Sequence, residues 1–222
     1  MFYKYDLSGS NFPVISEFPI AGATAILDGE VVKIASGLVV PAVAGETGAV
    51  IGVAAEAHTG VADIQNPRSN GNVIRVLCSP TAVFGCKPNT LLTATSGSGT
   101  TFAATALGAY ADNDWVGAKL VLKTKGAGST LTDPVGTVYD VTASTAATKL
   151  FTGVFPGGVT AGDIMLLLPP VLFQKGNFKA ATIDNMDYLI PTGTAARVVD
   201  VDVKQETVYI MSPLHQLGNK AS

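Results

Sequence analysis

Short apolar runs broken by turn residues constrain the fold of this chain more than any other feature. The segment LDGEVVKIASGLVVPAV, residues 27–43, alternates valine, isoleucine and leucine with small or polar residues. Asp28-Gly29 and Ser36-Gly37 interrupt these runs before a helix could grow. Such alternation between turns is typical of β-hairpins. The segment therefore predicts antiparallel strands, and it contains no arrangement of acid, base or nucleophile.

The same pattern recurs along the chain and predicts an all-β protein. Strands are expected at residues 24–27, 31–34, 38–43, 49–55, 73–78, 82–84, 90–92, 119–123, 137–142, 149–151, 164–168, 178–182, 195–203 and 207–211. Turns are expected at His58-Thr59-Gly60, Asn70-Gly71 and Lys204-Gln205-Glu206, and a short helix only within 180–188. We expect a small β-barrel or β-sandwich, β-tulip-like, with an inserted or second β-domain and extended termini.

Changes in composition divide the chain into four parts. Residues 1–20 form an N-terminal arm, and residues 21–95 form a first β-domain. A Ser/Gly loop at 96–101 precedes residues 102–170, which are rich in Thr, Ala and Gly and predict a second or inserted β-domain. Residues 171–222 are expected to supply return strands that complete the first domain, followed by a C-terminal tail.

The N-terminal arm is aromatic but has no clear period. Its aromatic residues are Phe2, Tyr3, Tyr5, Phe12 and Phe18. A segment of this kind cannot form a core of its own, so it either lies along its own domain or packs onto a neighbouring subunit. These five residues are the candidate contacts with another subunit or with a capsid.

Composition and charge exclude several classes of partner. The chain has 222 residues, of which 47% are hydrophobic and 14% are charged, whereas an average soluble protein has roughly 25% charged residues. Little charge is available to cover the outside, so the surface is built from small residues or hidden in an assembly. The formal charge is −3 without a basic cluster, so no nucleic-acid partner is expected.

A membrane span and a secretory signal are not expected either. The apolar runs stay well short of the ~20 residues that cross a bilayer. The opening MFYKYDLSGS lacks the basic and apolar parts of a signal peptide, so synthesis in a cytoplasm is expected. Such a compartment favours free, partly buried thiols at Cys78 and Cys86 over a disulfide.

The remaining candidates for chemistry are pairs of acids, histidines and aromatic residues. Asp200 and Asp202 have strand spacing, which places both carboxylates on one face; a solvated face is favoured over a cation or acid–base site. Asp112 and Asp114 repeat the spacing in a turn that lacks the further ligands of a calcium loop. No metal or cofactor site is expected, because the cysteines and histidines lack ligand spacing.

Two weaker sites stay open as alternatives. Tyr110 and Trp115 would form a glycan platform if both rings were exposed, although a lone Trp at a strand start more often anchors a core. His58 and His215 would need partners brought together in space to support a hydrolase, and packing or surface roles are favoured for them.

Part of the chain resembles the decoration proteins that cement the capsids of tailed phages. The similar run is IAGATAILDGEVVKIASGLVVPAVAGETGAVIGVAAEAHTG, residues 20–60, with its GE-V-V strand, hairpin, valine-rich return and G-V-A strand. The segments NDWVGAKLVL, VYDVTAS and FPGGVTAGDIMLLLPP look like the strand-and-turn pattern of β-rich virion accessory domains. The resemblance covers about two thirds of the chain.

The resemblance implies a virion structural protein without enzymatic activity or cofactors. Its partners would be the major capsid protein and further copies of itself, a trimer being favoured, with the aromatic arm as the clasp and residues 102–170 facing outward. A β-body of low charge suits many weak contacts that add through multivalency. The alternatives are a head-fibre, tail or minor capsid component, a carbohydrate-binding β-domain at Tyr110 and Trp115, and a hydrolase at His58 or His215.

Overall fold

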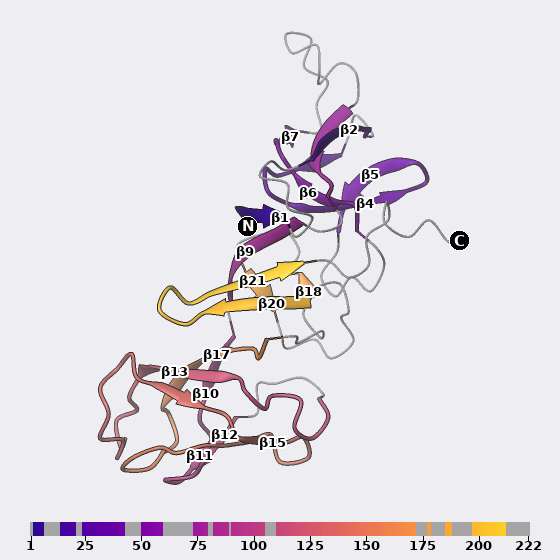
Figure 1. The fold of residues 1–222 in the computed structure, drawn as a ribbon. Coiled ribbons are helices and arrows are strands. Elements are labelled where there is room, and N and C mark those ends of the chain that lie inside the picture. The colour runs from indigo at the N-terminus through magenta and orange to yellow at the C-terminus, as the bar shows by residue number, and fades with distance from the viewer. Residues whose placement is uncertain are drawn as a thin grey trace.

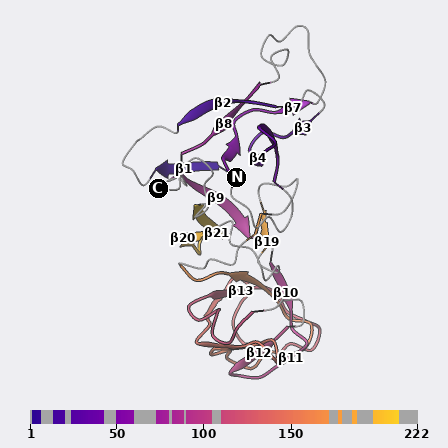
Figure 2. The same ribbon diagram turned by 90° about the vertical axis from the view of Figure 1, so that its right-hand side faces the viewer.

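The protein is built from stacked β-sheets. The computed structural model describes residues 2–6, 14–20, 24–42, 50–59, 73–79, 82–88, 90–104, 110–171, 177–178, 185–187 and 197–211. Every regular element in these ranges is a strand, and the strands form five sheets. They stack as three tiers along one axis, as Figures 1 and 2 show from two sides. The expected all-β fold is confirmed.

The first tier is a curled five-stranded sheet, which we call the five-stranded tier. Its order is β2 (Ile15–Pro19), β8 (Val73–Leu77), β6 (Gly52–Ala54), β4 (Val31–Ala35) and β5 (Leu38–Pro41). Ser36 and Gly37 join β4 to β5 with φ of 51° and 80°, the left-handed pair that a two-residue hairpin requires. A bridge between Ile20 and Val39 brings the two edges of the sheet together at one point.

An aliphatic core fills the inside of this tier. Its buried members are Ile20, Ile26, Val32, Val39, Ile51, Ala54, Ile74, Val76 and Cys78. A two-stranded ribbon of β3 (Ala25–Ile26) and β7 (His58–Thr59) lies beside it. The expected turn at His58-Thr59 is therefore wrong: β-pairing of Ile26 with His58 extends the backbone there.

The central tier is a six-stranded sheet arranged around β9. It contains β1 (Phe2–Asp6), β9 (Ala82–Pro88), β18 (Asn177–Phe178), β19 (Asn185–Asp187), β20 (Arg197–Asp202) and β21 (Thr207–Met211). Strands from the N-terminal and C-terminal parts of the chain thus meet at β9, which pairs with β1, β19 and β21. Residues 185–187, expected within a short helix, are a strand instead, because they pair with β9 and β18.

The third tier is a β-sandwich of residues 90–171, which we call the module. One sheet has the order β10 (Leu91–Thr93), β17 (Ile164–Leu168), β13 (Lys119–Thr124) and β14 (Val138–Asp140). The other has the order β11 (Ser96–Gly97), β12 (Thr101–Ala103), β16 (Leu150–Thr152) and β15 (Ala143–Thr145). β10 leads directly into β11 and β14 into β15, so each pair passes from one sheet to the other at a corner.

Aromatic side chains are the largest in the interior of the module. Phe102, Trp115, Phe151 and Phe155 are among its largest fully buried side chains. They belong to a continuous apolar cluster that also includes Val198, Val208 and Ile210 of the central tier. The module is therefore joined to the rest of the protein by apolar packing as well as by the chain itself.

One segment that the sequence predicted to be a loop is a strand. Ser96–Gly97, expected to be a flexible loop, pairs with Phe102 and Ala103 as β11. Gly97 has room only for hydrogen, because a Cβ there would lie 2.6 Å from the Cβ of Val159. Close packing rather than flexibility explains this glycine. The predicted turn at Asn70-Gly71 lies outside the described residues.

Candidate functional site

The N-terminal arm forms two strands, and each pairs with another strand of the same chain. β1, with Phe2, Tyr3 and Tyr5, pairs through its backbone with β9, and β2 pairs with β8. Phe18 is half-buried and packs against the aliphatic core of the five-stranded tier. Phe12 lies outside the described residues. The part of the arm that the structure describes thus lies along its own chain, at the two tiers farthest from the module's outer end (Figure 1).

The five-stranded tier exposes aliphatic side chains near the arm. Val14 and Ile15 are 51% and 49% exposed at the start of β2. Ile15 faces Leu77 across the strand pair, and Leu77 packs against the large apolar cluster. Leu27 and Leu38 are further exposed aliphatic residues of this tier. These four residues, Val14, Ile15, Leu27 and Leu38, come from three segments of the chain, and the set is referred to below as the apolar face.

An ion pair connects β8 to the segment that follows β6. Arg75 donates from its side-chain Nε to Glu56 at 2.8 Å, and its guanidinium Nη2 lies 2.7 Å from the same carboxylate oxygen. The other oxygen of Glu56 accepts the backbone N–H of Arg75 at 3.0 Å. The hydrogen bond and the charge of Glu56, with a smaller contribution from Glu17, raise the pKa of Arg75 above its ordinary value. The arrangement orients β8 and offers no free acid or base.

The proposed glycan platform is not assembled at the surface. The Trp115 side chain is 1% exposed and lies edge-on to Tyr110 and Phe151 at 6.4 Å. Tyr110 stacks on Phe151, and Lys149 Nζ lies 4.6 Å from the Tyr110 ring centroid. Burial and the charge of Asp112 raise the pKa of Tyr110 to about 12. Trp115 is thus a core residue. This agrees with the alternative interpretation, in which a lone Trp at a strand start anchors a core.

The acidic turn beside Tyr110 serves the module's own backbone. Asp112 Oδ1 accepts the N–H of Ala146 at 2.7 Å, and Asp114 Oδ2 accepts the N–H of Ala111 at 2.6 Å. Asn113, with φ of 64°, exchanges backbone and side-chain hydrogen bonds with Ser144. These bonds fasten the turn to β15 and leave both carboxylates engaged.

Asp200 and Asp202 also bind nearby amides. A bulge between Val198 and Asp200 shifts the register of β20, but from Asp200 to Asp202 the pairing with β21 is regular, as the expected strand spacing of the two aspartates requires. Asp200 Oδ1 accepts the N–H of Val201, and Asp202 Oδ1 accepts the N–H of Gln205 at 2.9 Å. The second bond closes the hairpin turn, which the sequence placed correctly at 204–206.

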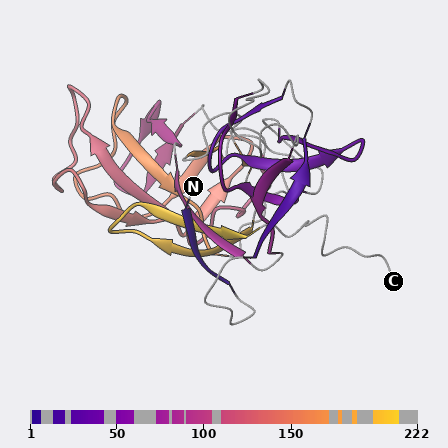
Figure 3. The same cartoon turned by 90° about the horizontal axis from the view of Figure 1, so that it is seen from above.

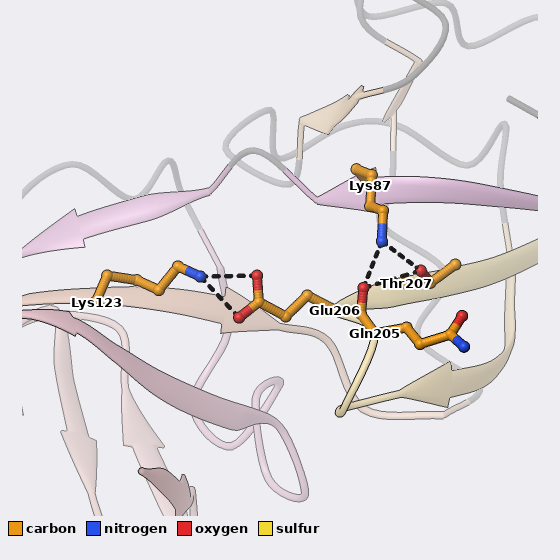
Figure 4. Close-up of polar contacts among 5 residues, drawn as sticks. All are labelled: Lys87, Lys123, Gln205, Glu206 and Thr207. Carbon is orange, nitrogen blue, oxygen red and sulfur yellow. Dashed lines mark hydrogen bonds and ion pairs between the residues drawn. The ribbon is translucent and has the colours of Figure 1, made fainter. Parts of the chain in front are cut away.

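The tip of this hairpin is held by two lysines from different tiers (Figure 4). Lys123 of β13 lies 2.7 Å from both carboxylate oxygens of Glu206. Lys87 of β9 donates to Thr207 Oγ1 at 2.8 Å and to the carbonyl oxygen of Gln205. The tip is thus bound both to its own sheet and to the module. Sequence reasoning recognised the turn but not its partners, which are more than 80 residues away.

Asp163 is a buried acid that sequence reasoning missed. Its side chain accepts the backbone N–H groups of Gly126 at 2.8 Å and Thr160 at 2.9 Å. Burial opposes ionisation, but these hydrogen bonds outweigh it and lower the pKa of Asp163 below its ordinary value. The carboxylate joins two loops at one end of the module.

The two cysteines are free and buried, as predicted. Cys78 Sγ lies 3.7 Å from the carbonyl oxygen of Val14, and Cys86 Sγ lies 3.4 Å from that of Val208. Burial raises the pKa of Cys86 to about 12. Such a thiol is unreactive, because the thiolate is the nucleophile.

Of the two histidines, only His58 lies among the described residues. His58 is buried in β7, and its Nδ1 lies 2.7 Å from the carbonyl oxygen of Thr24. His215 lies outside the described residues. Within the described ranges, no three His, Cys, Asp or Glu side chains form a group that could hold a metal.

No protein-family model, curated protein or solved structure matches this chain. Among the residues that the structure describes, no helix has the length and apolarity needed to cross a bilayer.

Proposed function

We propose that this protein is a virion structural protein that binds the outer surface of a phage capsid and cements it by bridging neighbouring capsid subunits. Its partners in this proposal are the major capsid protein and further copies of itself, most simply as a trimer. It has no enzymatic activity in this role. The proposal starts from the resemblance of residues 20–60 to decoration proteins.

The observation that supports it best is the division of the protein along its long axis. The arm strands β1 and β2 lie in the two tiers away from the module's outer end, and the module projects from the opposite end (Figure 1). A cement protein needs one end for the shell and a body attached to that end, and the continuous apolar cluster attaches the module to the central tier. We therefore assign the arm and the apolar face to the shell and the module to the outside.

The apolar face fits such a contact chemically. Its four aliphatic side chains expose between about a third and a half of their area in the free chain. Aliphatic area removed from water contributes roughly 25 cal/mol per Å². Each contact is weak, but many copies on a shell add their contributions, since bound neighbours raise the effective concentration of the next contact.

Copurification with assembled particles tests the proposal. The chain is produced in cells that assemble the phage particles, the particles are purified by sedimentation, and the copies per shell subunit are counted by quantitative mass spectrometry. We expect a fixed stoichiometric ratio. Recovery only in the unassembled fraction, or abundance in uninfected cells, would overturn the proposal.

A pair of surface variants tests the assigned orientation. Ile15→Glu places a charge on the apolar face, and Val154→Glu places the same charge at a 72% exposed position of the module. We expect Ile15→Glu to lower particle occupancy and Val154→Glu to leave it unchanged, with both variants folded by circular dichroism. The reverse result would show that the module faces the shell.

A further inference from the structure

The hairpin between β20 and β21 contacts the module in addition to the two places where the chain passes between the module and the central tier. The chain passes between the central tier and the module after β9 and again after β17. In Figure 1 the hairpin, seen from above in Figure 3, runs across the long axis of the protein, and its tip lies to the left of both crossings, where Lys123 of the module contacts it. A contact at that position resists rotation of the module about the crossings, because it acts at a distance from them.

The tip is first anchored to its own tier. Lys87 binds the carbonyl oxygen of Gln205 and the hydroxyl of Thr207, and Asp202 accepts the N–H of Gln205. These bonds hold the turn in one position on the central sheet. Because the backbone of the turn is fixed, the direction of a charged side chain on it is fixed as well.

Glu206 is the side chain that reaches the module. Its φ of 50° is left-handed, which is uncommon for a residue other than glycine. Both of its oxygens lie 2.7 Å from Lys123 Nζ, and the two side chains are 33% and 35% exposed. The backbone conformation would suit glycine better, so the local turn does not explain glutamate here; the ion pair with Lys123 does.

We propose that Lys123 and Glu206 form an ionic latch that fixes the orientation of the module relative to the central sheet, and that the module pivots about the two chain crossings when the latch opens. The apolar packing between the tiers is non-directional. The ion pair is directional and partly shielded from solvent, so it selects one of the orientations that the apolar contact permits. This inference does not depend on the proposed function.

Distance measurements between spin labels test the latch. Labels are placed at Leu27→Cys in the five-stranded tier and Val154→Cys in the module, both exposed positions, while Cys78 and Cys86 are buried. A parent protein without the new cysteines shows that the native thiols stay unlabelled. We expect a narrow distance distribution that becomes roughly twofold broader in Glu206→Gln, because tiers without a fixing contact move relative to each other.

Matched variants separate the latch from a merely structural role. Glu206→Gly suits the left-handed turn, so it is expected to keep the melting temperature while still broadening the distribution. The charge exchange Lys123→Glu with Glu206→Lys is expected to restore the narrow distribution. Lys119→Met removes an ion pair with Asp140 that lies within the module, and it is expected to change nothing. Unchanged distributions in Glu206→Gln and Glu206→Gly, or equal broadening in Lys119→Met, would overturn the proposal.

Discussion

The module and the five-stranded tier are both β-structures, but they are stabilised in different ways. The module encloses aromatic rings in mutual contact, with Phe102 and Phe151 6.0 Å apart. The five-stranded tier encloses aliphatic side chains, the largest of which, such as Ile51 and Ile74, are fully buried. The rings of Phe102, Trp115, Phe151 and Phe155 are larger than any of these aliphatic side chains, so each ring accounts for more of the stability of its region.

The loops of the two regions are also stabilised in different ways. In the module, Asp112, Asn113 and Asp163 bind backbone amides of other loops. In the five-stranded tier, short turns such as Ser36-Gly37 follow from local backbone preference, and the main charged contact is between Arg75 and Glu56. The module is therefore specified by long-range polar contacts between loops, and the tier mainly by the alternation of its strands.

The largest effect is expected from the only tryptophan. Trp115→Ala should lower the free energy of unfolding of the module by about 3–5 kcal/mol, since it deletes a large buried ring and leaves a cavity. Hydrogen exchange should show lost protection in β13 and β17 and unchanged protection in β8. Ile74→Ala is the matched variant in the five-stranded tier. It should lower the hydrogen-exchange protection of β8 and leave that of β13 and β17 unchanged. Equal loss in both regions from either variant would show that the tiers unfold as one unit and would break the comparison.

Two glycines with similar φ sharpen the role of the module's loops. Gly157 and Gly136 have φ of 83° and 94°. A Cβ on Gly157 would lie 2.0 Å from the carbonyl oxygen of Thr130, whereas one on Gly136 would meet nothing within 4 Å. Both alanine variants suffer the left-handed backbone, so Gly157→Ala should cost about 1–3 kcal/mol more because of the clash. Thermal unfolding measures the difference, and equal melting temperatures would contradict the close loop packing.

The strands were largely predictable and the loop contacts were not. Short apolar runs between turn residues located β4, β5, β8, β13, β17 and β21, each of which buries at least one side chain. β1 and β11 were missed, because their residues resemble an arm and a Ser/Gly loop and they become strands only by pairing with distant partners. Such pairing is set by tertiary context, which local propensity does not contain.

The candidate sites show the same limit. Burial of Trp115 was one of two alternatives that the sequence left open, and only the packing of Tyr110 and Phe151 around it decides between them. Asp163 gave no signal, since a single aspartate in a GD dipeptide looks like any turn residue. The partners of Glu206 could not be found, because Lys123 and Lys87 are distant in sequence. The capsid assignment stays a proposal, and particle copurification tests it.

Acid sensitivity should be a property of the module. Because the folded-state pKa of Asp163 is lowered, its contribution to stability is complete above its ordinary pKa and is lost as the pH falls below about 4. Asp163→Asn should lower the free energy of unfolding by about 1–3 kcal/mol at pH 7, since an amide nitrogen would face backbone N–H donors. The difference in the free energy of unfolding between the unmodified protein and Asp163→Asn should become smaller as the pH falls. Denaturant titrations at pH 7 and pH 3 measure this difference. A difference that stays constant would show that the charge of Asp163 is not the cause.

The smallest effect is expected in the five-stranded tier, at its ion pair. Arg75→Met keeps the length of the side chain but removes the bonds to Glu56. Exposed ion pairs contribute little and are screened by salt. The loss of stability should therefore be smaller than that of Asp163→Asn and should shrink further in concentrated sodium chloride. Denaturant titrations at low and high salt measure both quantities. A large, salt-independent loss would mean that this tier, like the module, depends on a specific polar contact, and the contrast between the two regions would then be one of core composition alone.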